Sequence, residues 1–528
     1  MRRVAALGAA LALAALVSGC TPPPTVETPS ATAPAPVTTA SGSPVPSVTP
    51  APIPTDPAWA KALADAQALP VEQAAGQVIM ATLTNGSHAK ATSLVGDSHV
   101  GGVILMGGAV SSADQVASLN AAIASADVAR GWPVIIATDE EGGTVQRLRP
   151  ALRYVSAFMA AGANGDAGEI REYYVALGAQ MRQLGFTMNL APDADVTIGL
   201  KDPTIRTRSA GASPSAVAAV VNAAWEGFEA GGVTPVIKHF PGHGSVTVNS
   251  HVGLPVQAHT IAELESRDLV PFRSAIAAGV PAVMVGHIRV AGWGKLPASV
   301  NPRAYAYLRD DMGFGGLLMT DAMDMAAVAD MYGPGGGAVA ALSAGADLVL
   351  MPSDPAAAIR AIVWAVDRGD LPRERLDDAA AHVILAAREQ APEPSAPIEQ
   401  RPREFSEGSI VVAAADCSAL IGDTFRVTGG TRAQRVALSD DLGAEGFAWA
   451  SDGTEIALVG GDRGSANADV VVATGGPWGL PASKAKVYVE TWGGGAEQLH
   501  ALAKVLSGAI PPRGTWPVKV ALPYRACS

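Results

Sequence analysis

The stretch Lys238-His-Phe-Pro-Gly-His-Gly-Ser-Val-Thr-Val-Asn-Ser-His251 follows a short apolar run, Thr234–Ile237, that has the composition of a buried strand. Two glycines and a proline force a turn there, and three of the nine histidines of the chain, His239, His243 and His251, lie in the stretch. A parallel α/β scaffold presents side chains to ligands from such strand-to-loop junctions, so we expect a functional site here. A surface turn with incidental histidines is one alternative. A zinc site is another, although the histidine spacings match no common metal pattern.

Apolar strand-like runs alternate with Ala-, Leu- and Glu-rich helical stretches on both sides of this loop, over residues 58–395. Continuous apolar strands separated by helices predict a parallel sheet that is covered on both faces. Eight such units favour a (β/α)8 barrel of the TIM type over an open, doubly wound sheet. The expected strands are Gln77–Leu83, Gly102–Met106, Pro133–Thr138, Thr187–Leu190, Pro235–Ile237, Ala282–Val285, Gly316–Thr320 and Asp347–Met351.

Ionisable side chains follow the carboxyl ends of at least five of these strands, and in a barrel those ends converge on one mouth. A single such charge is often only a helix N-cap, but the repetition indicates a site. The candidate set contains carboxylates, imidazoles and cations, with no metal-ligand spacing, no phosphate loop and no nucleophile elbow, so we expect no metal and no cofactor. Its members are Asp139, Arg208, Lys238, His239, His251, His287 and Asp321.

This set suits a polyol, because charged groups form strong hydrogen bonds with sugar hydroxyls. Glycoside cleavage needs one carboxylate at the anomeric carbon and one proton donor at the leaving oxygen. Asp321, after Leu317–Thr320, is the candidate nucleophile. His251 is the candidate acid/base, since an imidazole titrates near neutral pH. The interpretation at this point is an α/β enzyme that acts on a carbohydrate.

The stretch from Lys238 to His251 resembles the signature of glycoside hydrolase family 3, in its bacterial exo-β-N-acetylglucosaminidase branch. Three further segments are similar to that family: Asp139-Glu-Glu-Gly-Gly-Thr-Val-Gln-Arg-Leu148, Asn189-Leu-Ala-Pro-Asp-Ala-Asp-Val196 with Arg208-Ser209, and Leu317-Leu-Met-Thr-Asp-Ala-Met-Asp-Met325. The resemblance implies a retaining, two-step mechanism with Asp321 as nucleophile and His251 as acid/base on a mobile loop. It also implies that Asp139, Arg208, Lys238 and His239 bind the hydroxyls of a terminal β-linked N-acetylglucosamine, and we add His287 to this group.

Two residues depart from the family pattern. Asn249 stands where the branch has an aspartate beside the catalytic histidine, so a neutral amide replaces the charge that would stabilise the imidazolium. Asp324 and Glu141 are candidates to supply that charge instead. Thr144 stands where the family has an arginine, which we expect to alter a substrate contact. The alternatives are therefore a β-glucosidase, another β-hexosidase or a phosphorylase of the same family, or a catalytically weak cell-wall glycan-binding protein.

The N-terminus predicts export. Arg2 and Arg3 precede an apolar run too short to span a bilayer, and the run ends in Val-Ser-Gly-Cys20, which resembles a bacterial lipobox. We expect a lipoprotein signal peptide over residues 1–20, lipid attachment to Cys20, and an extracellular protein anchored in the cell membrane, with ordinary secretion as the alternative. Residues 21–57 are rich in Pro, Thr and Ala and predict a disordered spacer. The formal net charge of -12 argues against a nucleic-acid partner.

A Pro-, Glu- and Arg-rich linker near residues 392–403 precedes a second domain over residues 404–528, which we expect to be a shortened α/β sandwich. Its end, Gly508–Val518, resembles the closing segment of the second domain of the family. We assign it no catalytic group, and we interpret Asp440 and Asp441 as solvated loop residues. Cys417 and Cys527 are a candidate disulfide in an exported protein, with two separate thiols as the alternative. The overall prediction is a hydrolase that acts on peptidoglycan fragments.

Overall fold

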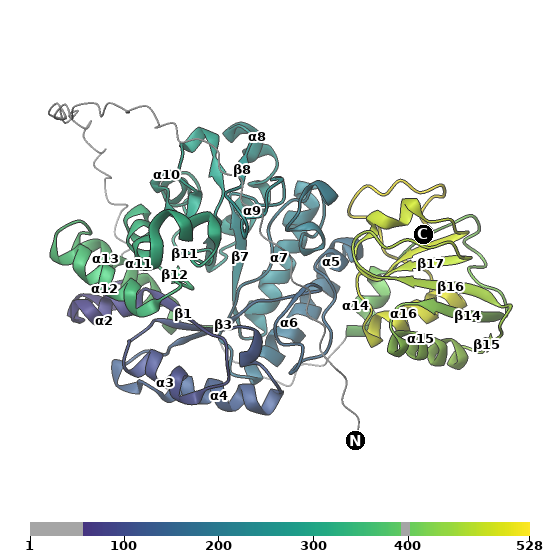
Figure 1. Ribbon diagram of the computed structural model, residues 1–528, viewed down its shortest axis with the longest axis horizontal. Helices are drawn as coiled ribbons and strands as arrows, with labels where there is room; N and C mark the ends of the chain where they lie inside the picture. Colours follow the sequence, from purple (N-terminus) through teal and green to yellow (C-terminus); the bar gives the residue numbers. More distant parts are fainter. Residues whose placement is uncertain (1–55, 392–401, 528) are drawn as a thin grey trace, which may run out of the picture. The chain divides into compact units, whose positions relative to one another are not determined.

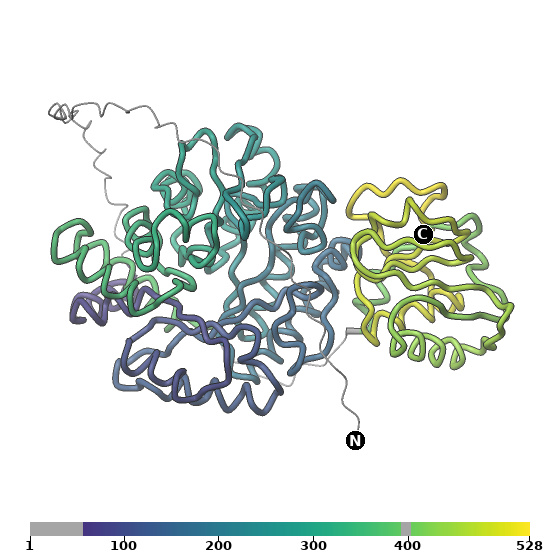
Figure 2. Tube along the Cα trace, in the orientation of Figure 1, coloured from purple at the N-terminus to yellow at the C-terminus, as the bar shows by residue number. Residues whose placement is uncertain are grey.

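The computed structural model describes residues 56–391 and 402–527 (Figures 1 and 2). The predicted signal peptide, Cys20, nearly all of the 21–57 spacer and residues 392–401 of the predicted linker lie outside the described residues. Helix α1 begins at Pro57, where Asp56 accepts a hydrogen bond from the backbone N–H of Ala58 and caps the first turn. Neither described range contains a helix that is both long and apolar enough to cross a membrane.

Residues 57–391 form the predicted barrel, and all eight of the strands expected from the sequence are present in this described part. Neighbouring strands are parallel, in the order β11-β9-β7-β6-β3-β2-β1-β12. A parallel bridge between Met319 and Leu348 joins the two ends of the sheet. The strands are β1 (Ile79–Leu83), β2 (Gly102–Leu105), β3 (Ile135–Thr138), β6 (Met188–Asn189), β7 (Thr234–Phe240), β9 (Ala282–Val285), β11 (Leu317–Thr320) and β12 (Val349–Leu350).

Successive residues of each strand point to opposite faces of the sheet, and apolar residues occupy both faces. The helices cover the outer face. Inward-facing side chains, among them Met80, Val236 and Met284, fill the barrel, and they belong to a cluster separate from the core beneath the helices. The helices are α1 (Pro57–Ala68), α2 (Val71–Gln77), α3 (His88–Gly96), α4 (Ala113–Ser125), α5 (Met159–Asn164), α6 (Ala167–Gln183), α7 (Pro214–Ala230), α8 (Ile261–Ser266), α9 (Val270–Ala277), α10 (Pro302–Ala306), α11 (Ala326–Ala344), α12 (Pro355–Asp367) and α13 (Arg373–Arg388).

Two small sheets lie in the loops after the barrel strands. One is an antiparallel hairpin of β4 (Glu140–Gly142) and β5 (Val145–Gln146), which continues from the end of β3. The other pairs β8 (Val256–Gln257) with β10 (Arg289–Val290) in parallel. The first hairpin requires a glycine, because Gly142 has φ of 90° and a Cβ there would lie 2.1 Å from the carbonyl oxygen of Ser156. The hairpin thereby fixes where Asp139 and Glu141 lie.

The second domain is an α/β domain, as expected. In the described residues 402–527, a six-stranded sheet has the order β13-β18-β17-β16-β14-β15, and only the β13–β18 pair is antiparallel. Its strands are β13 (Val411–Ala414), β14 (Thr424–Gly429), β15 (Ala448–Trp449), β16 (Thr454–Val459), β17 (Val470–Ala473) and β18 (Val487–Glu490), and its helices are α14 (Pro402–Ser409), α15 (Arg432–Ala444) and α16 (Ala496–Ser507).

The interpretation of Asp440 and Asp441 as loop residues is wrong, because both lie in the last turns of α15. A capping box at Thr431 starts this helix, and Leu438 and Leu442 bury one face of it. Asp441 accepts a hydrogen bond from the imidazole of His500 on α16 at 3.2 Å. The two carboxylates therefore belong to the polar face of a packed helix.

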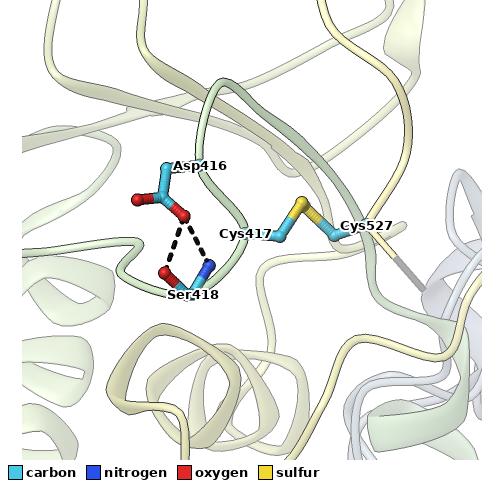
Figure 3. Close-up of a disulfide and its surroundings, with 4 residues drawn as sticks. All are labelled: Asp416, Cys417, Ser418 and Cys527. Atoms are coloured by element: carbon cyan, nitrogen blue, oxygen red, sulfur yellow. Dashed lines mark hydrogen bonds between the residues drawn. A yellow bond between two sulfur atoms is a disulfide. The ribbon is translucent and has the colours of Figure 1, made fainter.

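The structure joins Cys417 and Cys527 by a disulfide, with Cα atoms 5.7 Å apart (Figure 3). The turn around Cys417 is shaped by Asp416, whose carboxylate accepts hydrogen bonds from the backbone N–H and the hydroxyl of Ser418. Cys527 itself is buried, and its backbone N–H donates to Val412. The C-terminal tail is thus fastened to the edge strand β13.

Candidate active site

Strand β7 carries the largest share of the candidate site at the carboxyl end of the barrel. It runs to Phe240, so Lys238 and His239 belong to the strand itself and are held by its pairing with β6 and β9. Lys238 Nζ lies 2.9 Å from Asp139 Oδ1 and 2.5 Å from Glu141 Oε1. Burial works against the charge of Lys238, but these two carboxylates raise the pKa of the ammonium above its ordinary value. Lys238 is therefore a fixed cation.

Arg208 lies beside this cation, in a short 3₁₀ helix over Arg206–Arg208. Its Nε and one terminal nitrogen donate to the two oxygens of Glu141 at 2.8 and 3.0 Å, in the bidentate geometry that suits guanidinium. Burial would raise the pKa of Glu141, but Arg208 and Lys238 lower it to about 2. Glu141 is thus committed to two cations and is not available to serve as the carboxylate partner of His251.

Two carboxylates that follow β6 complete the cluster. Asp195 Oδ2 accepts a hydrogen bond from His239 Nδ1 at 2.7 Å, and this carboxylate raises the pKa of His239 against the effect of burial. Asp193 Oδ2 lies 3.4 Å from Arg208 Nε, and burial raises the pKa of Asp193 to about 7 even beside that cation. Neither aspartate was among the site residues expected from the sequence, although the positions of both after a strand were a usable signal.

Asp193, Asp195 and His239 are also close enough to be metal ligands, with donor atoms within 4.8 Å of one another. Arg208 and Lys238, however, already place fixed positive charge against these carboxylates, and His239 Nδ1 is taken by Asp195. A second cluster, Asp347, Asp378 and His382, is likewise occupied, because Asp347 pairs with Arg309 and Arg375. The first arrangement is better suited to a neutral polyol than to a cation.

Asp321 follows β11 and is buried, with 8% of its surface exposed. Burial would raise its pKa, but interactions with the neighbouring imidazoles of His287 and His239 outweigh this effect and lower the pKa of Asp321 below its ordinary value. The backbone N–H of Ala322 also donates to Asp321 Oδ1 at 2.8 Å. A carboxylate that stays ionised in a buried site is what a nucleophile requires.

The structure places His287, an expected sugar contact, against two protein groups. His287 is fully buried, its Nε2 donates to the carbonyl oxygen of Ala322 at 2.8 Å, and its Nδ1 lies 2.6 Å from Ser299 Oγ. Burial lowers its pKa. Both ring nitrogens are therefore occupied by protein groups, and His287 positions the turn that carries Asp321.

His251 and Asn249 lie on the loop between β7 and β8. Asn249 Oδ1 accepts hydrogen bonds from both the backbone N–H and the Nδ1 of His251, each at 2.9 Å. A proton on Nδ1 leaves Nε2 of the neutral ring as the basic nitrogen, so the amide sets the tautomer that the missing aspartate would set. Thr144, the other departure from the family pattern, lies exposed at the tip of the β4–β5 hairpin.

The comparisons with known proteins agree with this geometry. The model of the glycosyl hydrolase family 3 N-terminal domain matches residues 71–386. The β-hexosaminidase LpqI of Mycobacterium tuberculosis is 33% identical over 312 residues, covering 56% of this chain and 77% of the relative. A β-hexosaminidase of Xylella fastidiosa is 35% identical over 262 residues, covering 48% of this chain and 77% of the relative.

A solved family 3 β-N-acetylglucosaminidase from Paenibacillus superposes with a TM-score of 0.74 at 27% identity, covering 86% of this chain and 99% of that one. The LpqI structure superposes with a TM-score of 0.56 at 31% identity, covering 63% of this chain and 97% of that one. The family resemblance proposed from the sequence is confirmed: this chain belongs to glycosyl hydrolase family 3.

Proposed function

We propose that the protein is a retaining β-N-acetylhexosaminidase that removes terminal β-linked N-acetylglucosamine. The observation that carries this proposal is Asp321, a buried carboxylate with a lowered pKa at the carboxyl end of β11. The choice of sugar is supported by the relatives, which are named β-hexosaminidases and a β-N-acetylglucosaminidase. In this mechanism Asp321 attacks the anomeric carbon, and water then hydrolyses the resulting glycosyl ester.

His251 is the acid/base of both steps. It protonates the leaving oxygen in the first step through Nε2 and removes a proton from water through the same atom in the second. Its hydrogen bond from Nδ1 to Asn249 holds the ring orientation. An imidazole can play both parts because its two protonation states are both accessible near neutral pH.

The cluster of charged side chains around Lys238 and Arg208 orients the sugar. Asp139 and Arg208 keep 16% and 13% of their side chains exposed, whereas Lys238 and Glu141 keep 2% each. We therefore assign direct hydroxyl contacts to Asp139 and Arg208, and also to His239, whose exposed fraction is 8%. Lys238 and Glu141 hold Asp139 and Arg208 in position. Charge-assisted hydrogen bonds are directional, so this positioning affects how well the sugar is bound.

We also propose that the enzyme is exported, lipid-anchored through Cys20 on the extracellular face of the cell membrane, and that it acts on peptidoglycan fragments. The lipobox-like sequence at Val17–Cys20 supports the anchor. The disulfide between Cys417 and Cys527 supports an oxidising compartment. Replacing Cys20 with Ser should release the protein from the membrane fraction, and unchanged retention in that fraction would argue against the anchor.

The activity is tested by offering the purified protein aryl β-N-acetylglucosaminide and aryl β-glucoside in parallel. We expect hydrolysis of the first substrate to exceed that of the second, with loss of activity in Asp321→Ala. Preferred cleavage of the glucoside would replace the proposed specificity with that of a β-glucosidase. Sugar binding without turnover would indicate a glycan-binding protein.

A further inference from the structure

One stretch of the loop that carries His251, residues 247–254, has a single buried residue. In the fully described stretch of residues 247–254, Ser250 is buried with 2% of its surface exposed, while every other residue is exposed or half-exposed. Val252, two residues further on, is 77% exposed although it is apolar. A buried polar residue inside an otherwise solvated loop requires a hydrogen-bonding partner in the protein.

That partner is His243, which lies near the start of the same loop. Its Nε2 is 3.0 Å from Ser250 Oγ, and its ring is 1% exposed. The backbone N–H of His243 donates to Asp195 Oδ1 at 2.5 Å, while the other oxygen of Asp195 accepts from His239 Nδ1. The buried carboxylate of Asp195 therefore connects His239, at the sugar-binding end of β7, to His243, which holds the loop.

The rest of the loop is organised around the same point. Asn249 Oδ1 accepts from two atoms of His251, and the Asn249 carbonyl accepts from the backbone N–H groups of Val252 and Gly253. Residues 249–253 thus form a compact turn. Ser250 lies between Asn249 and His251, and its hydrogen bond to His243 fastens this turn to the barrel.

The charge state of His243 is suited to a permanent contact. Burial, together with the neighbouring His239, lowers the pKa of His243 to about 4, so the His243 ring is neutral near pH 7. Its Nδ1 has no hydrogen-bond partner among the residues that the structure describes. The bond to Ser250 is then the single side-chain hydrogen bond of this ring among the described residues, and it does not switch with pH near neutrality.

We propose that the His243–Ser250 hydrogen bond anchors the acid/base loop and makes His243 and Ser250 positioning residues for proton transfer. This inference rests on the proposed role of His251 as acid/base. Proton transfer depends steeply on geometry, and a displacement of about 1 Å can cost on the order of 100-fold in rate. Without the anchor, His251 samples positions from which it cannot reach the leaving oxygen.

The test compares Ser250→Ala with Thr247→Ala, which removes an exposed hydroxyl from the same loop. For each variant, kcat/KM is measured for aryl β-N-acetylglucosaminides whose leaving groups run from phenol to dinitrophenol, and thermal unfolding is recorded. Phenol needs a proton from His251 to depart and dinitrophenol does not. We expect Ser250→Ala to lose about 10- to 100-fold on the phenyl substrate and less than about 3-fold on the dinitrophenyl substrate.

Thr247→Ala should match wild type throughout the series. A second variant, His243→Gln, places an amide nitrogen where Nε2 lies, and it should keep most of the wild-type rate on the phenyl substrate. An equal loss for all leaving groups in Ser250→Ala, or no loss, would overturn the anchor while leaving the glycosidase intact. Failure of wild type to cleave any member of the series would overturn the proposed function and the anchor together.

Discussion

Replacing Asn249 with Asp should restore a charge that this chain lacks beside its acid/base. Asn249 Oδ1 is 2.9 Å from His251 Nδ1, so an aspartate in the same rotamer would place a negative charge about 4 Å from the centre of the imidazolium. At that distance opposite charges attract by about 1 kcal/mol in water and by about 4 kcal/mol at the effective dielectric constant of a protein surface. The loop is exposed in the free protein. A bound substrate excludes water from residue 249 and His251, which brings their attraction closer to about 4 kcal/mol.

These energies set an upper limit on the increase in rate of between about 5-fold and about 1000-fold, because each 1.36 kcal/mol is a factor of ten and the transition state keeps only part of the imidazolium charge. The increase should appear in kcat/KM for substrates with poor leaving groups, which depend on protonation by the charged imidazole. The assay is the initial rate on phenyl β-N-acetylglucosaminide, with Asn249→Ala as the control. The control loses both hydrogen bonds to His251 and should be slower than wild type.

A rate for Asn249→Asp at or below that of wild type would refute this reasoning. It would mean that another group already supplies the charge. Asp324 is the remaining candidate, since Glu141 is bound to Arg208 and Lys238. The double variant Asn249→Asp, Asp324→Asn would then separate the two carboxylates.

Two further predictions concern stability. Replacing Cys417 and Cys527 with Ser opens a link across 110 residues and should lower the free energy of unfolding of the second domain by about 2 to 5 kcal/mol, measured by urea unfolding; an unchanged midpoint would contradict it. Burial raises the pKa of Glu490 well above its ordinary value, so the folded chain keeps a proton that the unfolded chain loses. This contribution to stability is complete below about pH 4 and declines as the pH rises. Glu490→Gln keeps an acceptor for the backbone N–H of Trp492. Its melting temperature should therefore match that of wild type at pH 5 and exceed it at pH 9. An equal difference in melting temperature at both pH values would contradict the assignment.

The barrel could be predicted from the sequence because its strands are buried on both faces and read as continuous apolar runs. Strand β14 has no such run: Phe425 is its one fully buried residue, and the remaining residues are half-exposed or exposed. Helix α15 gives an equally weak sequence signal, since Leu438 and Leu442 are the only residues that it buries. A sequence pattern shows burial on both faces far more clearly than burial on one.

The site was predictable to the extent that residue type and strand end determine it. Asp139 and Asp321 directly follow β3 and β11 as predicted, whereas β7 extends to Phe240 and includes Lys238 and His239. The role of His287 was not predictable, because its two partners, Ser299 and the Ala322 carbonyl, come from separate loops. Ser250 had no signal in the sequence at all, since a serine between two functional residues has the composition of any polar loop. Its burial depends on where His243 lies in space.

The central claim is that Asp321 is the nucleophile of a β-N-acetylhexosaminidase. The most direct measurement is the hydrolysis of an aryl β-N-acetylglucosaminide by wild type and by Asp321→Ala, with mass spectrometry of the wild-type protein after reaction with a slow, fluorinated substrate. The account predicts turnover by wild type alone and a glycosyl adduct on the peptide that contains Asp321. Turnover that survives in Asp321→Ala, or an adduct on another carboxylate, would contradict it.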